Sequence, residues 1–156
     1  VNHIKKVTPD SLQYIIKDMF ETITLYQNRI VKAESIPLAS GKYQVDIEFE
    51  VSKYRNNEKG RKFYGESVGD TLSYKTETMK KPILSVPLED YIDIGIFTEE
   101  EVNGKKKEVA LYLQKHKITT IQNKLTIIVG NKPTEVGVDP YNKLIDTQSE
   151  DNRKKL

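Results

Sequence analysis

Strict alternation of apolar and polar side chains is the clearest pattern in the chain, and it runs over residues 43–52. Because successive side chains of a strand point to opposite faces, this pattern predicts a half-buried β-strand. The preceding Ser40-Gly41 pair predicts a turn that returns from an earlier strand near residues 29–36. The apolar members of the alternation are Tyr43, Val45, Ile47, Phe49 and Val51.

Further strands are predicted at residues 91–97, 108–115 and 124–129, which are rich in β-branched and aromatic side chains. Glycine and proline interrupt residues 56–87, where only short strands at 62–64 and 72–75 are expected. No alternation of strands and helices is present. The pattern therefore predicts a mainly β protein, an antiparallel β-sandwich of immunoglobulin- or fibronectin-like architecture preceded by one N-terminal α-helix.

The helix is predicted over residues 8–26. Thr8 suits the N-cap, Pro9 the first helical position, and Asp10 the positive end of the helix dipole. Apolar residues recur at steps of three and four, so they share one stripe. An isolated helix of this length is marginal in water, and the stripe must pack on the rest of the chain or on a neighbouring domain. The stripe consists of Leu12, Ile15, Ile16, Met19, Phe20 and Ile23.

These patterns divide the chain into a helical connector (1–27), a β-sandwich domain (28–145) and a disordered tail (146–156). The tail is polar, so it buries too little apolar area to offset the entropy of ordering. A first residue of Val rather than Met suggests processing or excision from a longer polypeptide. No apolar run approaches the roughly 18 residues of a membrane helix, so we expect a soluble piece without direct membrane insertion.

The composition argues against several kinds of binding site and reactive group. A formal charge of +2, from 25 Lys and Arg against 23 Asp and Glu, gives no field that would gather nucleic acid. The absence of cysteine excludes disulfides, thiolate metal sites and a cysteine nucleophile. The two histidines, His3 and His116, do not form the H-E-x-x-H pattern of zinc peptidases, and His116 is interpreted as a solvated or hydrogen-bonded side chain.

Residues 65–69 match the G-x-S-x-G pattern of serine hydrolases, with Ser67 as the candidate nucleophile. Asp90 or Asp93 and then His116 follow in the order of an α/β-hydrolase triad. That motif requires a strand that turns sharply into a helix, and the residues after it lack helical periodicity. We therefore interpret the motif as a turn bounded by glycines.

Acidic residues form small groups at Glu89-Asp90, Asp93 and 99–101, which could hold a hard cation. The ligand spacing of an EF-hand is missing, so we interpret them as solvated strand ends. Three lysines at 105–107 directly follow the acidic triplet, which favours a polar hairpin tip over a phosphate-binding patch. The residues thus predict no catalytic, cofactor-binding or metal-binding site.

Four stretches go beyond generic patterning: TPDSLQY (8–14) with DMFETITLY (18–26), DYIDIGIF (90–97), LYLQKHKI (111–118) and VGVDPYNKLID (136–146). They resemble the C-terminal end of large bacterial membrane proteins that join an ABC-type permease region to an aminopeptidase N-like zinc metallopeptidase region. Residues 56–87 depart from that family, so the resemblance implies nothing for them.

The resemblance implies a non-catalytic accessory C-terminal domain that packs against the peptidase domain of the same polypeptide. The family's zinc ligands and catalytic glutamate lie upstream, so zinc is expected in the parent peptidase domain and no cofactor in this part. The parent would be a zinc-dependent aminopeptidase anchored in a bacterial inner membrane, with this domain expected outside the cytoplasm. The alternative from the residues alone is a peptide- or glycan-binding β-sandwich module that uses strand edges and loops.

Overall fold

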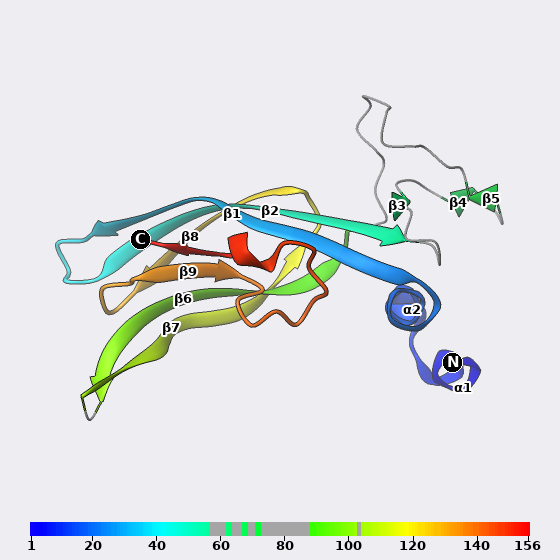
Figure 1. Ribbon diagram of the computed structural model, residues 1–156, viewed down its shortest axis with the longest axis horizontal. Coiled ribbons are helices and arrows are strands. Elements are labelled where there is room, and N and C mark those ends of the chain that lie inside the picture. Colours follow the sequence, from blue (N-terminus) through cyan, green and yellow to red (C-terminus); the bar gives the residue numbers. More distant parts are fainter. Residues whose placement is uncertain (57–61, 64–66, 69–70, 73–87, 103) are drawn as a thin grey trace. The chain divides into compact units, whose positions relative to one another are not determined.

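The computed structural model describes residues 1–56, 62–63, 67–68, 71–72, 88–102 and 104–156. The chain forms two compact units (Figure 1). One comprises Val1–Leu25 and Lys53–Pro87, and the other comprises Tyr26–Ser52 and Leu88–Leu156. The second unit contains most of the regular structure, and the two long strands β1 and β2 run from one unit into the other.

Two antiparallel sheets build the second unit. In the first sheet β2 (Tyr43–Asn56) lies between β1 (Ile23–Pro37) and β8 (Gln122–Val129), and Tyr43 to Glu50 of β2 pair with Val129 to Gln122 of β8. The second sheet has the order β10-β9-β6-β7. Its strands are β6 (Asp90–Val102), β7 (Lys105–Ile118), β9 (Glu135–Val138) and β10 (Arg153–Lys155).

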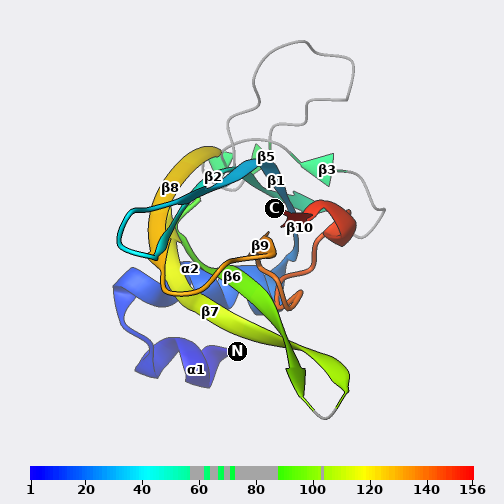
Figure 2. The ribbon, with the colours of Figure 1, turned by 90° about the vertical axis from the view of Figure 1, so that its left-hand side faces the viewer.

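One hydrophobic core joins the two sheets, with β1, β2 and β8 on one side and β6 and β7 on the other (Figure 2). The alternation seen in the sequence sends Val45, Ile47, Phe49 and Val51 inward, where each is at most 1% exposed. From the opposite sheet the core receives Ile92, Ile94, Ile96, Val136 and Val138. The mainly β class and the antiparallel pairing predicted from the sequence are thus confirmed.

The predicted strands and turns compare closely with the structure. The segments predicted at 91–97, 108–115 and 124–129 correspond to β6, β7 and β8, and the first two extend further to form one long hairpin. Gly41 occupies the predicted turn between β1 and β2 with φ of +78°, a conformation that favours glycine. Short strands are present at β3 (Lys62–Phe63), β4 (Ser67–Val68) and β5 (Thr71–Leu72), whereas residues 64 and 73–75 of the predicted pair lie outside the described residues.

The N-terminal region corrects the prediction of one helix over residues 8–26. A short helix α1 (Asn2–Val7) comes first, and Thr8 ends it by donating a hydrogen bond from Oγ1 to the carbonyl of Ile4 rather than starting the next helix. The reason is Pro9, which lacks an N–H and drives the preceding residue out of helical conformation, as the ψ of 128° at Thr8 shows. Three short helical segments follow: the 3₁₀ turn Asp10–Leu12, α2 (Gln13–Ile16) and the π-helical turn Lys17–Glu21.

Strand β1 then begins at Ile23, so the helical connector is shorter than the predicted 1–27. Its first residues, Ile23 to Tyr26, combine β-branched and aromatic side chains, which favour a strand once tertiary pairing is offered. Within the described helical segments only Ile16 of the predicted apolar stripe is buried.

The last residues correct a second prediction, because the tail over 146–156 is ordered. We call residues 145–156 the C-terminal segment. Tyr26 of β1 donates its N–H to the carbonyl of Ile145 (2.9 Å) and accepts the N–H of Thr147 (3.1 Å), and β10 pairs with β9. The segment therefore connects the edges of both sheets (Figure 1). Backbone hydrogen bonds and the fully buried polar Asn152 hold it, so a hydrophobicity argument could not detect it.

Candidate functional site

Strand β6 is buried on both faces from Ile92 to Thr98, although only one face of its sheet packs against the other sheet. Ile92, Ile94 and Ile96 face the core, and the alternating positions 91, 93, 95 and 97 face away from it. We call this second side of the strand the outer face of β6. Residues from the chain's last twenty positions cover it, and it gathers most of the buried charged groups of this unit.

The aromatic ring of Phe97 lies over Gly95 on this face. A Cβ atom placed on Gly95 would lie 2.5 Å from Cε2 and Cζ of Phe97, so the ring occupies the space that a side chain at Gly95 would need. Tyr141 meets the ring edge-on at 5.9 Å between centroids, and Cζ of Arg153 lies 4.6 Å from its centre. Arg153 is therefore placed for a cation–π contact with Phe97.

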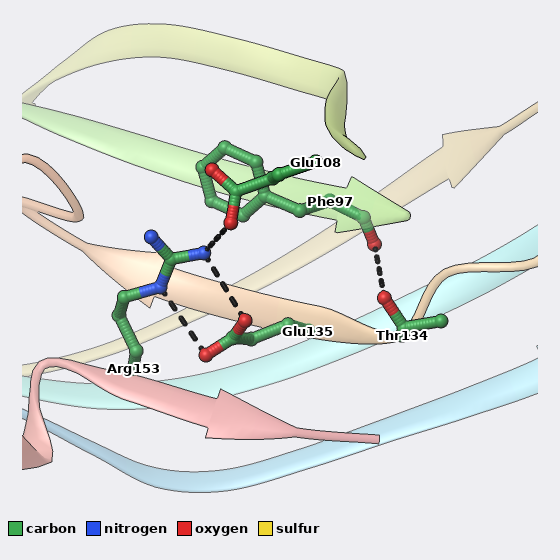
Figure 3. Close-up of polar contacts among 5 residues, drawn as sticks. All are labelled: Phe97, Glu108, Thr134, Glu135 and Arg153. Carbon is green, nitrogen blue, oxygen red and sulfur yellow. Dashed lines mark hydrogen bonds and ion pairs between the residues drawn. The ribbon is translucent and has the colours of Figure 1, made fainter. Parts of the chain in front are cut away.

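Arg153 is also the centre of an ion-pair cluster (Figure 3). Its Nε and Nη2 donate to the two carboxylate oxygens of Glu135 at 3.2 and 3.1 Å, and Nη2 donates to Glu108 as well. Burial opposes the charge of Arg153, but these hydrogen bonds outweigh it and raise the pKa of the guanidinium above its ordinary value. The cluster joins β7, β9 and β10, so it fastens the C-terminal segment to the sheet.

Asp93 forms a second cluster on the outer face of β6. Its side chain is 7% exposed and contacts Nζ of Lys143 at 2.6 Å and Nζ of Lys115 at 3.5 Å. Burial by itself would raise the pKa of Asp93, but the hydrogen bond from Lys143 and the charges of both lysines hold it below its usual range. An ionised carboxylate held by two cations is a weak general base, so this arrangement favours a structural role.

Asp139 shapes the loop that covers this face. It has φ of +44°, its N–H donates to the carbonyl of Asp93, and its carboxylate accepts the N–H groups of Lys143 (3.0 Å) and Leu144 (2.8 Å). Burial raises the pKa of Asp139, which the two backbone donors oppose. The resulting corner places Pro140 against Gly95 and Gly137.

The β6–β7 register places the acidic and histidine residues that were weighed as partners of Ser67. His116 lies opposite Ile92 in the β6–β7 register, whereas Asp93 lies opposite Lys115, so the side chains of Asp93 and His116 point to opposite faces of the sheet. Nε2 of His116 lies 2.6 Å from the hydroxyl of Tyr112. Asp90 lies opposite Ile118, so its side chain is on the same face of the sheet as that of His116.

The candidate nucleophile belongs to the other unit. Ser67 lies in β4, and its side chain, like Gly65, Glu66 and Gly69, falls outside the described residues. His3 lies in α1 and is exposed.

Each of the three acidic groups weighed as cation ligands has one member that pairs with lysine. Glu99 pairs with Lys106 at 2.9 Å across the β6–β7 hairpin, and Glu89 pairs with Lys117 at 3.4 Å. Gly104 has φ of +72° at the hairpin tip, where the sequence predicted a polar turn. In the described ranges, no three or more His, Asp or Glu side chains are placed together as metal ligands.

Replacing Asp93 by asparagine is expected to lower the free energy of unfolding by about 1–2 kcal/mol at pH 7, because a charged hydrogen bond is lost. The loss stays this small because the side chains of both lysines are more than half exposed, and water screens their charges. The pKa of Asp93 is lowered in the folded chain, so its contribution is present above the unfolded value of about 4 and is lost as the pH falls through the lower folded value. Urea unfolding at pH 7 and pH 3 should therefore show a difference between wild type and Asp93→Asn that shrinks toward acid. Glu99→Gln, at an exposed pair, is the control and should be nearly neutral.

The fold and this face define a class: a mainly β protein with two antiparallel sheets, in which the ion pairs of Arg153 hold the C-terminal segment. Comparisons with models of protein families, with curated proteins and with solved structures found no match. Over the described residues, the helices are all too short or too polar to cross a membrane.

Proposed function

We propose that this chain is a non-catalytic accessory domain that packs against a larger protein. The resemblance noted in the sequence supplies the finer form of the proposal: the C-terminal domain of a membrane-anchored, aminopeptidase N-like zinc metallopeptidase, in contact with the peptidase domain of the same polypeptide. Two antiparallel sheets around one core are compatible with the immunoglobulin- or fibronectin-like sandwich expected for such a domain.

The observation that carries the proposal is the exposure of apolar side chains in the N-terminal helical region. Val7 is 72% exposed, Met19 67% and Phe20 55%. Large apolar side chains left exposed within one short region favour contact with another protein. We call the whole set the N-terminal apolar residues, and it consists of Val1, Ile4, Val7, Leu12, Met19, Phe20 and Ile23.

The chemistry of the described residues supports the non-catalytic part of the proposal. Asp93 is neutralised by two lysines, and His116 contacts a tyrosine rather than a carboxylate. A general acid–base pair needs its partners within hydrogen-bond reach of one another and of a substrate. We therefore expect the 156-residue chain, supplied with zinc, to hydrolyse no aminoacyl reporter substrate. Robust turnover that a chelator abolishes would contradict the proposal.

The contact itself can be tested with the peptidase region of such a protein, prepared without its own C-terminal domain. We expect this chain to bind it, and we expect Met19→Ser combined with Phe20→Ser to weaken binding about tenfold or more, because buried large apolar side chains dominate interface energies. Ile128→Ser is the matched control, since Ile128 is 57% exposed on β8 of the other unit. Calorimetric titration measures both affinities, and equal losses in the two variants would count against the assignment of the surface.

A second candidate, a peptide- or glycan-binding module, is favoured by aromatic exposure on the second sheet. Tyr91 is 59% exposed at one end of the outer face of β6, and Tyr141 is 48% exposed near Phe97. Exposed aromatic side chains beside fixed charged groups are common in binding sites for such ligands. Peptide and glycan arrays that give only background signal would eliminate this candidate.

A further inference from the structure

The two sheets end at two sides of their common core, and the C-terminal segment covers one of these sides. It hydrogen-bonds to β1 and pairs with β9, and Nζ of Lys154 donates to the carbonyl of Val31 at 2.9 Å. The core-facing side chains of β1 on this side, Tyr26, Asn28 and Ile30, are at most 7% exposed. The edge of the first sheet at β1 is therefore well covered.

The opposite side of the core ends in β7 and β8, which lie next to each other (Figure 2). Their core-facing side chains are less well covered, because Tyr112 and His116 of β7 and Leu125 and Ile127 of β8 are only half-buried. Among the described residues, β7 pairs with β6 alone, and no backbone hydrogen bond reaches its other edge. β7 therefore has a free edge along its 14 residues.

The most regular part of this edge is residues 112–118. Their register with β6 is unbroken, since the one shift falls between Ile96 and Phe97, where Leu111 is the extra residue of β7. A regular strand edge presents unpaired N–H and C=O groups, and an extended peptide can add to it as a further strand. Short strands and bulges normally protect such edges, and residues 112–118 form a continuous stretch without a bulge.

The charge of β7 favours one kind of peptide at this edge. The strand contains five lysines and one glutamate, and Lys115 and Lys117 lie in its regular part. Their ion pairs with β6 are loose: Lys115 lies 3.5 Å from Asp93, and Lys117 lies 3.4 Å from Glu89. Asp93 has a shorter contact, 2.6 Å, with Lys143. Because both β7 lysines are about half exposed, they remain accessible to a strand on the other side of β7.

We propose that residues 112–118 bind an extended peptide by strand addition, with acidic side chains at alternate positions and apolar side chains between them. The acidic side chains would lie beside Lys115 and Lys117 as cross-strand neighbours. The apolar ones would point toward the core and cover Tyr112 and His116. A second copy of this chain is a poorer occupant, because pairing two β7 strands over these residues brings their lysines together.

This inference deepens the peptide-binding candidate and rests on it, because it gives that candidate a place and a sequence preference. It is independent of the accessory-domain proposal, whose contact surface, the N-terminal apolar residues, belongs to the other unit.

Synthetic peptides test the preference on the full 156-residue chain by calorimetric titration. The probe is a peptide with Glu and Val in alternation and blocked ends. The same peptide with Lys in place of Glu should bind about tenfold or more weakly, because its cross-strand charges repel those of β7. A version of the acidic peptide with proline at its centre keeps the charge but lacks an N–H, and it should lose about as much affinity. Equal binding of the acidic peptide and its proline version would indicate diffuse attraction and overturns the proposal.

Amide hydrogen exchange of the wild-type chain locates the bound strand. Saturation with the acidic peptide should slow exchange at alternate residues of 112–118, whose N–H groups point away from β6, and should leave β1 and β9 unchanged. Lys117→Glu should weaken binding about threefold or more. Lys124→Glu is the matched control, because Lys124 also pairs with a glutamate but lies on β8 in the first sheet, and it should change affinity less than about twofold.

The outcomes separate this inference from the candidate on which it rests. Peptide binding that protects other residues instead of 112–118 overturns the assignment of the edge and leaves the peptide-binding candidate in place. No binding of any peptide at about 1 mM, the weak end of specific recognition, eliminates both. Protection of residues 112–118 that appears without peptide as the protein concentration rises would show that a second copy occupies the edge, which also overturns the proposal.

Discussion

Replacing Gly95 by alanine is expected to lower the free energy of unfolding by about 2–3 kcal/mol, because the new methyl group overpacks a filled site. Its Cβ would lie 2.5 Å from the Phe97 ring and 3.2 Å from Cγ of Pro140. The ring cannot move away freely, since Phe97 is fully buried and lies between Gly95, Tyr141 and Arg153. Thermal unfolding should show a midpoint roughly 4–12 °C below that of the wild type.

Gly130→Ala is the matched control, because a Cβ on Gly130 meets nothing within 4 Å, and its effect should stay within about 0.5 kcal/mol. A double-mutant cycle with Phe97→Leu tests the cause directly. If the clash with the ring is responsible, Gly95→Ala should cost clearly less in the Phe97→Leu background. An unchanged cost in that background would show that the ring is not the obstacle.

The sequence predicted those parts of the fold that local periodicity determines. Residues 43–52, with their alternating pattern, lie in β2, and the β-rich stretches lie in β6, β7 and β8. The pattern is visible in the sequence because each of these strands places a row of apolar side chains in the core. The prediction of one helix over residues 8–26 was wrong for a local reason. Pro9 separates α1 from the following turns, and residues 23–26 begin β1, whose pairing with the neighbouring strand β2 no local pattern reveals.

The covered outer face of β6 was beyond prediction because its partners are distant in sequence. Arg153 contacts Phe97, Glu108 and Glu135, and Lys143 contacts Asp93 from fifty residues away. A polar tail without apolar periodicity gives no signal of such contacts. One usable signal was overlooked: Gly95 within an otherwise β-branched and aromatic strand indicates that a ring or another chain segment approaches closely there.

The first unit contains a buried ion pair that could not be predicted from the sequence. Nζ of Lys53, at the far end of β2, lies 2.5 Å from Oδ2 of Asp18, and the two side chains are 0% and 9% exposed. The ammonium group also lies 5.6 Å from the centre of the Tyr14 ring. Asp18 belongs to the helical region and Lys53 to a strand, so the pair attaches one to the other within this unit.

Lys53→Met should therefore destabilise the helical region by about 3–5 kcal/mol, because it leaves the carboxylate of Asp18 buried without its counter-charge. Amide hydrogen exchange of residues 13–21 should accelerate strongly, while the strands of the second unit stay protected, as expected for local unfolding. The double variant Lys53→Met, Asp18→Asn should recover part of the loss, since no charge is then buried. Lys32→Met is the control: its pair with Glu34 is more than half exposed on both sides, and its removal should cost at most about 0.5 kcal/mol. Similar exchange rates in the Lys53 and Lys32 variants would mean that the buried pair does not hold the helical region in place.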